Sequence, residues 1–212
     1  MDEALRWLLD TVASVDPVLR TTLAGLAIML ETSVLVGVVV PGDTVVIVAA
    51  TGVTSFAEGV ILAIVAIIGS LAGESMGFGI GRWLGPHLRT SRAGRWIGEK
   101  NWVRAERYVQ RRGGIAIFLS RFLPVMHSLV PLTVGMSTYS YRRFLLWTLP
   151  ACVIWATLYV SIAAGAAASY RQLSDTAHWA AYVFVGGILL LVVGVFAAKK
   201  VIARAERRHL ND

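Results

Sequence analysis

Three ionisable residues of this chain stand in segments that are otherwise apolar enough to lie within a membrane. Glu31 lies inside an apolar stretch, Asp43 follows the Pro41-Gly42 break, and Arg121 precedes a proline-interrupted apolar stretch. A charge in hydrocarbon costs on the order of 3 kcal/mol by insertion scales, so such residues usually face a polar cavity. The three residues therefore predict a route for a substrate or an ion.

The composition places these residues in a membrane protein. Of the 212 residues, 56% are hydrophobic and only 16% are charged, and the mean hydropathy is +0.66. A soluble domain would carry about a quarter charged residues, whereas several windows here reach the roughly 20 apolar residues that cross a bilayer. We expect an all-α polytopic membrane protein with a single domain.

The net charge of +7 is distributed as in a membrane protein. Residues 82–112 hold nine Lys and Arg against two acids, and residues 199–208 hold five more. Basic residues beside membrane spans set the topology and contact anionic lipid headgroups, so membrane lipids and not nucleic acid are the expected partners. Cys152 is the only cysteine and the four histidines are scattered, so we expect no metal site and no cofactor.

The first half of the chain is divided by its breakers. Residues 1–16 predict an amphipathic helix in the membrane interface. Residues 18–57 predict either a re-entrant hairpin, which is favoured because it places Glu31 and Asp43 in one polar environment, or a full span over 20–40 followed by a loop. Residues 60–81 predict a full span. Four glycines spaced by four form a smooth face on it, suited to close packing or to a sliding surface beside a transport path: Gly69, Gly73, Gly77 and Gly81.

The second half repeats this plan. Residues 82–113 predict a basic interfacial segment in the cytoplasm, and residues 114–139 predict a second re-entrant hairpin interrupted by Pro124 and Pro131. Residues 144–168 and 179–198 predict two spans joined by a short loop that holds Arg171, and residues 199–212 a cytoplasmic tail. All basic clusters fall on one side only if 114–139 does not cross. The expected fold is an inverted repeat with two opposed re-entrant hairpins and about three full transmembrane helices.

Three motifs in this order resemble the DedA family of bacterial membrane proteins, which is related to the VTT-domain lipid scramblases. The resemblance covers residues 31 to about 157. The motifs are Glu31-Thr32 with Pro41-Gly42-Asp43, then Gly73-Glu74 with Gly77, Gly81-Arg82 and Gly85, then Gly113-Gly114, Phe118, Arg121-Phe122, Pro124, Pro131, Gly135-Met136 and Phe144.

The resemblance implies two membrane-embedded acids, Glu31 and Asp43, and an embedded arginine at Arg121. The family's second arginine falls six residues later, where this sequence has His127. Arginine is always charged and grips phosphate with a planar fork, whereas histidine exchanges its proton near physiological pH. His127 therefore forms a basic pair with Arg121 only when its ring is protonated. Glu74 either joins the acid set or lies near an interface.

The function implied by the resemblance is lipid transport in the bacterial cytoplasmic membrane. We expect movement of undecaprenyl phosphate between leaflets, coupled to protons through the acids, with Arg121 and His127 on the lipid phosphate. Alternatives are a general phospholipid flippase or scramblase and a proton-coupled exporter of small cations. Outside transport they are a lipid phosphatase, disfavoured because no nucleophile–base–acid set is evident, and a structural assembly factor in which the charges pin the hairpins together. We expect no enzyme. The oligomeric state stays open, with a homo-oligomer as one alternative.

Overall fold

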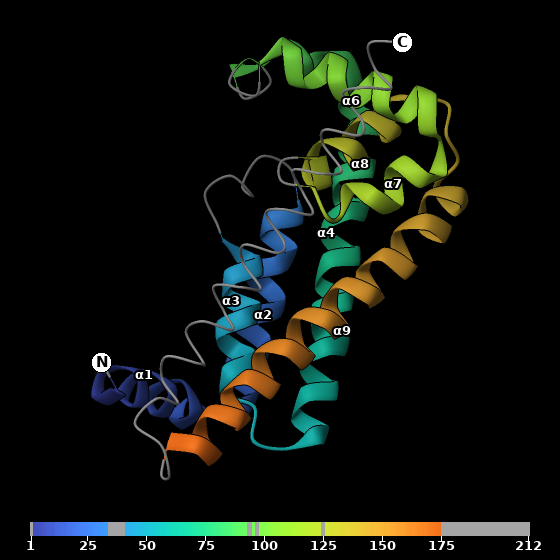
Figure 1. Ribbon diagram of the computed structural model, residues 1–212. Coiled ribbons are helices and arrows are strands. Elements are labelled where there is room, and N and C mark those ends of the chain that lie inside the picture. Colours follow the sequence, from blue (N-terminus) through green and yellow to red (C-terminus); the bar gives the residue numbers. More distant parts are fainter. Residues whose placement is uncertain (1, 34–40, 93–94, 96–97, 124–125, 175–212) are drawn as a thin grey trace.

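The computed structural model describes residues 2–33, 41–92, 95, 98–123 and 126–174, and its regular elements there are all helices. Figure 1 shows α2 (Pro17–Thr32) and α3 (Gly42–Thr51) in the lower half of the molecule and α7 (Gly114–Ser120) and α8 (Met126–Met136) in the upper half. The long helices α4 (Phe56–Thr90) and α9 (Tyr141–Ser174) run past both pairs. The all-helical class is confirmed for the described residues. Residues 179–198 and 199–212 lie outside them.

The chain turns sharply between its first two helices. α1 (Asp2–Ser14) and α2 form a pair bent by 97° at residues 15–16. The Asp16 carboxylate accepts the Leu19 amide hydrogen at 2.9 Å and Pro17 begins α2, which is a favourable start for a helix because the proline has no amide hydrogen to satisfy. α1 therefore lies across the lower end of the molecule (Figure 1).

Two described helices are long and apolar enough to cross a membrane. These are Phe56–Gly85, with 30 residues, and Tyr141–Gln172, with 32. A third is added if the bent pair of Trp7–Ser14 and Pro17–Thr32 is counted as one span. α4 continues to Thr90, past the residue 81 at which we expected the span to end, although Gly85 has non-helical angles with φ 24°. A positive φ is costly for any residue but glycine, so Gly85 marks a bend.

The glycine row of α4 divides its face between two partners. A Cβ on Gly69 would lie 2.5 Å from the Gly25 carbonyl oxygen, and one on Gly73 would collide with Thr32 and the Met29 carbonyl oxygen, all in α2. Further along, Gly77 faces Pro131 and Gly81 faces the Leu132 carbonyl, both in α8. The row therefore acts as a close-packing surface, which is one of the two roles we expected of it.

Each long helix packs mainly against one helix from each pair. α4 contacts α2 and α8, α9 contacts α3 and α7, and the two long helices contact each other. Two buried apolar clusters result. The lower cluster includes Ile28, Val46, Leu62 and Trp155, and the upper one includes Phe78, Trp102, Leu132 and Phe144. Arg171 lies within α9 and not in the expected loop, because its guanidinium donates to the Thr51 carbonyl oxygen at 2.7 Å, and that contact holds it in the helix.

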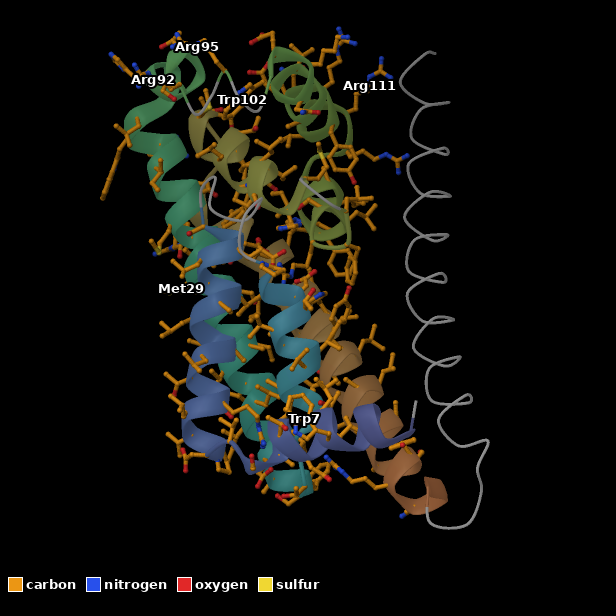
Figure 2. All side chains as sticks on the ribbon, turned by 90° about the vertical axis from the view of Figure 1, so that its left-hand side faces the viewer. Trp7, Met29, Arg92, Arg95, Trp102 and Arg111 are labelled. Atoms are coloured by element: carbon orange, nitrogen blue, oxygen red, sulfur yellow. The ribbon has the colours of Figure 1, made fainter. Side chains whose placement is uncertain are left out.

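The outer surface is apolar along its middle and basic at one end. Many large apolar side chains are exposed, among them Leu23, Ile68 and Leu146, as expected for helices surrounded by lipid tails. α6 (Glu99–Arg112) buries Trp102 and Tyr108 and exposes Lys100, Arg107 and Arg111. Figure 2 shows Arg92, Arg95 and Arg111 at the end opposite to Trp7. Charge is therefore segregated along the long axis.

Candidate functional site

Glu31 caps the helix that carries Asp43. α3 starts after Pro41, whose side chain makes no cap hydrogen bond, so its first amide groups need partners from elsewhere. The Asp43 amide donates to Glu31 Oε2 at 2.6 Å, and the positive end of the helix dipole favours both carboxylates. Gly42 permits this approach, because a Cβ there would lie 2.6 Å from the Ala27 carbonyl oxygen and 2.7 Å from Glu31 Oε2.

Arg121 occupies the opposite kind of helix end. It follows α7 directly, and the amide groups of Phe122 and Leu123 donate to Leu119 and Ser120 carbonyl oxygens in a tight turn. The negative end of a helix dipole favours a cation there, although α7 is short. The Arg121 residue is only 4% exposed. The start of α3 therefore stabilises carboxylates, and the end of α7 stabilises the guanidinium of Arg121.

Arg121 is paired with two acids from different elements. Its Nη2 lies 3.6 Å from Asp43 Oδ1 on α3, and its Nη1 lies 3.8 Å from Glu74 Oε1 on α4. Both separations exceed the distance of a hydrogen bond, and within the described part of the chain Arg121 Nε and Nη2 have no hydrogen-bond partner. The acids thus balance the charge of the guanidinium while leaving donors available.

α9 completes the surroundings of the arginine. The Arg121 Cζ lies 3.9 Å from the centroid of the Trp155 ring, which gives a cation–π contact. Cys152, one turn earlier, donates its thiol to Glu74 Oε1 at 3.8 Å. Four elements therefore converge on one guanidinium: α3, α4, α7 and α9.

His127 pairs with the remaining acid. Its Nε2 lies 3.8 Å from Glu31 Oε1, and its Nδ1 lies 3.3 Å from the Leu123 carbonyl oxygen. A carbonyl oxygen can only accept, so Nδ1 is the nitrogen that carries hydrogen in that contact. A neutral ring would then turn a lone pair toward a carboxylate. The pair is favourable only when a proton is held by Nε2 or by Glu31.

The structure brings all five residues expected in the site together: Glu31, Asp43, Glu74, Arg121 and His127. Glu74 belongs to the acid set and is 2% exposed. The residues expected to shape the site lie around it. Pro41 precedes α3, Pro131 contacts Gly77, and Gly135 packs on the Phe78 backbone. Pro124 lies outside the described residues.

Trp155 and Cys152 are site residues that the sequence does not single out. Both lie inside an apolar span, where an aromatic ring or a thiol is usually core. Ser128 is a third, since its hydroxyl donates to the Glu31 carbonyl oxygen at 3.2 Å and ties α8 to α2. Trp155 could have been identified only from its depth, level with the charged residues. That depth depends on how α9 packs against the other helices, which the sequence does not show.

The cluster holds more acidic than basic side chains. Three carboxyl groups face one arginine and one histidine. Among the described residues, no group of three or more His, Cys, Asp or Glu is placed to hold a metal ion.

Comparison with known proteins gives one family. The model of the VTT domain matches residues 40–165. The chain is 25% identical to protein DedA of Escherichia coli K12 over 137 residues, 63% of each protein. It is 28% identical over 206 residues, 92% of each, to an uncharacterized membrane protein of Mycobacterium bovis.

A further relative has a different kind of name. An alkaline phosphatase-like protein of Lactococcus lactis IL1403 is 27% identical over 158 residues, 69% of this chain and 74% of that protein. The chain spans less than two thirds of the length of E. coli DedA. No solved structure matches the chain significantly.

Proposed function

The chain belongs to the VTT-domain family of DedA membrane proteins, and from that premise we propose that it moves an anionic lipid between the leaflets of the membrane. It is a multi-pass membrane protein, with apolar helices long enough to span and relatives named as membrane proteins. One observation carries the proposal: a buried arginine that lies between two acids, 3.6 and 3.8 Å away, with donors left unmatched by the described residues.

Arg121 is the proposed site of the lipid phosphate. A guanidinium binds phosphate oxygens through parallel N–H donors, and the Nε and Nη2 hydrogens are the ones without hydrogen-bond partners in the described structure. The Trp155 ring supports one face of the guanidinium. A headgroup arriving there would take over from Asp43 and Glu74 as the counter-charge.

Protons would make that exchange favourable. When Asp43 and Glu74 are protonated they no longer compete for the arginine, and a phosphate anion replaces them. When they lose their protons on the other side, they displace the phosphate. His127 and Glu31 supply a second proton position at Nε2, and their neighbour Asp43 is joined to Glu31 by the 2.6 Å hydrogen bond.

An inverted repeat of two re-entrant hairpins is the proposed architecture for alternating access. The helix pairings support it. α4 packs mainly on α2, the first helix of the pair that precedes it, and on α8, the second helix of the other pair. In the same way, α9 packs mainly on α7 and on α3. Exchanging α2, α3 and α4 for α7, α8 and α9 leaves this pattern of contacts unchanged. Broken helices that meet between such repeats form the sites of many secondary transporters.

The basic end is the proposed cytoplasmic side of a bacterial inner membrane. Arg82 donates to the Ser137 carbonyl oxygen at 2.6 Å, so the end of the α4 span and the start of α9 lie together. α6 packs on α8, which ends just before Ser137, so the basic residues of α6 and of positions 142–143 lie at one end, as the positive-inside rule requires. The proposed cargo is undecaprenyl phosphate, whose single charged group suits one arginine.

Transport of labelled undecaprenyl phosphate in proteoliposomes tests the proposal. Wild-type protein should move the lipid in response to an imposed proton gradient, and Arg121→Gln should reduce the rate at least tenfold. Arg143→Gln is the matched control, because this arginine is exposed and lies outside the site. Absence of movement by wild-type protein under either direction of the gradient would refute lipid phosphate transport.

The same vesicles separate the alternatives. Equal movement of neutral phospholipid would indicate a scramblase, and movement of small cations an exporter. Because the Lactococcus relative is named alkaline phosphatase-like, a lipid phosphatase is a further alternative. Release of inorganic phosphate would support it. Normal cellular function after neutral replacement of Glu31, Asp43, Glu74 and Arg121 together would favour a structural role.

A further inference from the structure

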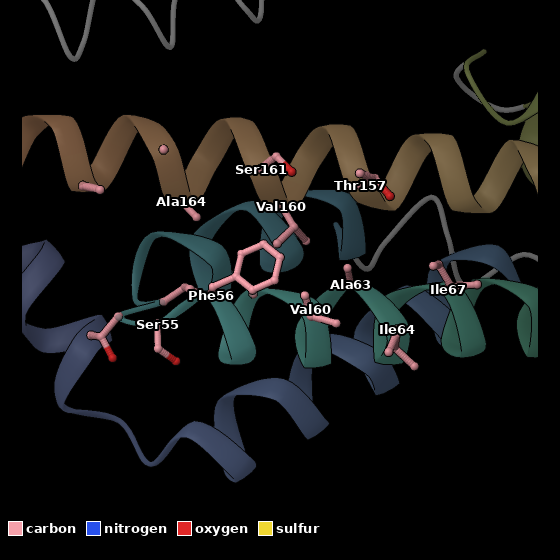
Figure 3. Close-up of a pocket in the computed structure, with 15 residues that line it drawn as sticks. Ser55, Phe56, Val60, Ala63, Ile64, Ile67, Thr157, Val160, Ser161 and Ala164 are labelled. Carbon is pink, nitrogen blue, oxygen red and sulfur yellow. The ribbon is translucent and has the colours of Figure 1, made fainter.

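A groove of about 640 Å³ lies between the first half of α4 and the second half of α9. Figure 3 shows Phe56, Val60 and Ile64 on the α4 side and Val160, Ser161 and Ala164 on the α9 side. The volume is in the range of pockets that enclose small ligands. Its lining is mostly apolar and holds no charged residue, so it suits a hydrocarbon chain and not a headgroup.

The groove leads toward the charged site. Ile67, at its upper end, is seven residues before Glu74 and therefore on the same face of α4. Thr157, on the α9 side, is two residues after Trp155 and therefore at nearly the same level along α9, although the two side chains point to different sides of the helix. The groove and the cluster thus follow one another along one face of α4.

The length of the groove matches one leaflet. At about 1.5 Å per residue, the stretch of α4 from Phe56 to Ile67 is roughly 16 Å long. Half of a hydrocarbon core of about 30 Å is roughly 15 Å. A chain lying in the groove would reach from the lower end of α4 to Ile67, which is about 10 Å along the helix from Glu74.

We propose that this groove binds the hydrocarbon tail of the lipid whose anionic headgroup pairs with Arg121, an inference that rests on the proposed function. Surrounding lipid tails are as apolar as the groove, so binding there adds little affinity. Its contribution is position. A tail held against α4 and α9 keeps the headgroup aligned with the guanidinium instead of letting the lipid diffuse away along the membrane.

Gly165 offers a clean perturbation. It lines the groove, it is exposed, and a Cβ built on it meets nothing within 4 Å. Gly165→Trp should therefore fill the groove without disturbing the core. Gly79 is the matched control, since it is also a helical glycine with no atom within 4 Å of a Cβ, but it lies outside the groove. Ser161→Trp, at a second exposed groove position, repeats the test independently.

The experiment is photo-cross-linking by a long-chain polyprenyl phosphate that carries a diazirine in its tail, with the full chain in phosphatidylcholine vesicles. Labelling should concentrate on residues 56–67 and 157–168. It should fall at least fivefold in Gly165→Trp and Ser161→Trp and stay unchanged in Gly79→Trp. A polyprenol without phosphate should label the groove at least fivefold less, as should the phosphate in Arg121→Gln.

Three results would overturn the inference. One is labelling spread evenly over exposed apolar residues such as Leu23 and Leu146. Another is groove labelling that ignores both tryptophans. The third is an efficient disulfide, in the presence of lipid, between Ser161→Cys and a cysteine placed in residues 179–198, because that segment would then occupy the groove. Site-specific labelling without transport would refute the proposed function alone; transport without groove labelling would refute the tail site alone.

Discussion

Replacing Arg121 by glutamine should lower the free energy of unfolding by about 3–4 kcal/mol. Unit charges at the 3.6 and 3.8 Å separations from Asp43 and Glu74 attract by about 4–5 kcal/mol each at an effective dielectric constant of about 20. The destabilisation is smaller than the sum of these attractions, because an unpaired carboxylate can take up a proton. Protonating an ordinary carboxyl group at pH 7 costs about 4 kcal/mol. The Asp43 side chain is 27% exposed, so water stabilises its charge, whereas the Glu74 side chain is 3% exposed and bears most of the cost.

The measurement is reversible unfolding in mixed micelles, with a rescue built in. Arg121→Gln/Glu74→Gln should be about 2 kcal/mol more stable than Arg121→Gln alone, because it removes the carboxyl left without its counter-charge. Arg143→Gln, an exposed arginine, should change stability by less than about 0.5 kcal/mol. A loss below about 1 kcal/mol for Arg121→Gln, or a double variant no more stable than the single one, would show that the ion pairs do not hold α3, α4 and α7 together.

Three further changes test the packing. Gly73→Ala should destabilise the protein by about 1–3 kcal/mol in the same unfolding assay, because its methyl group collides with α2, while Gly79→Ala should be neutral or stabilise by up to about 1 kcal/mol. Trp102→Ala should cost about 3–5 kcal/mol since this ring is 1% exposed, and Trp83→Ala, 88% exposed, less than about 0.5 kcal/mol; equal losses would contradict the upper core. Asp16→Ala should destabilise the start of α2 by about 1 kcal/mol, measured as faster hydrogen exchange at the amides that follow residue 16. Unchanged exchange would contradict the role of Asp16 as a helix cap.

The sequence singles out the charged residues of the candidate site because charge is costly in a bilayer. Whatever the fold, a carboxylate or guanidinium in an apolar segment must find a polar partner. Glu31, Asp43 and Arg121 can therefore be identified by composition alone, and the proline and glycine breaks beside them indicate where the backbone is interrupted. His127 required the resemblance, since a lone histidine has no such signal.

The glycine row shows where sequence reasoning ends. Its spacing of four predicts a close-packing face, because a helix repeats nearly every four residues. It does not say that Gly69 and Gly73 contact α2 while Gly77 and Gly81 contact α8. That division follows from the placement of two distant segments along one long helix.

By itself, the amino-acid sequence determined the class of protein, the apolar segments of the two long helices that the structure describes, and the residues too costly to leave in lipid. These follow from local periodicity and from the free energy of transfer, which each segment carries alone. Only the tertiary structure decided that Arg121 lies between Asp43 and Glu74, that His127 faces Glu31, and that Trp155 covers the guanidinium. Those pairings join residues far apart in the chain, and they are set by which helices pack together.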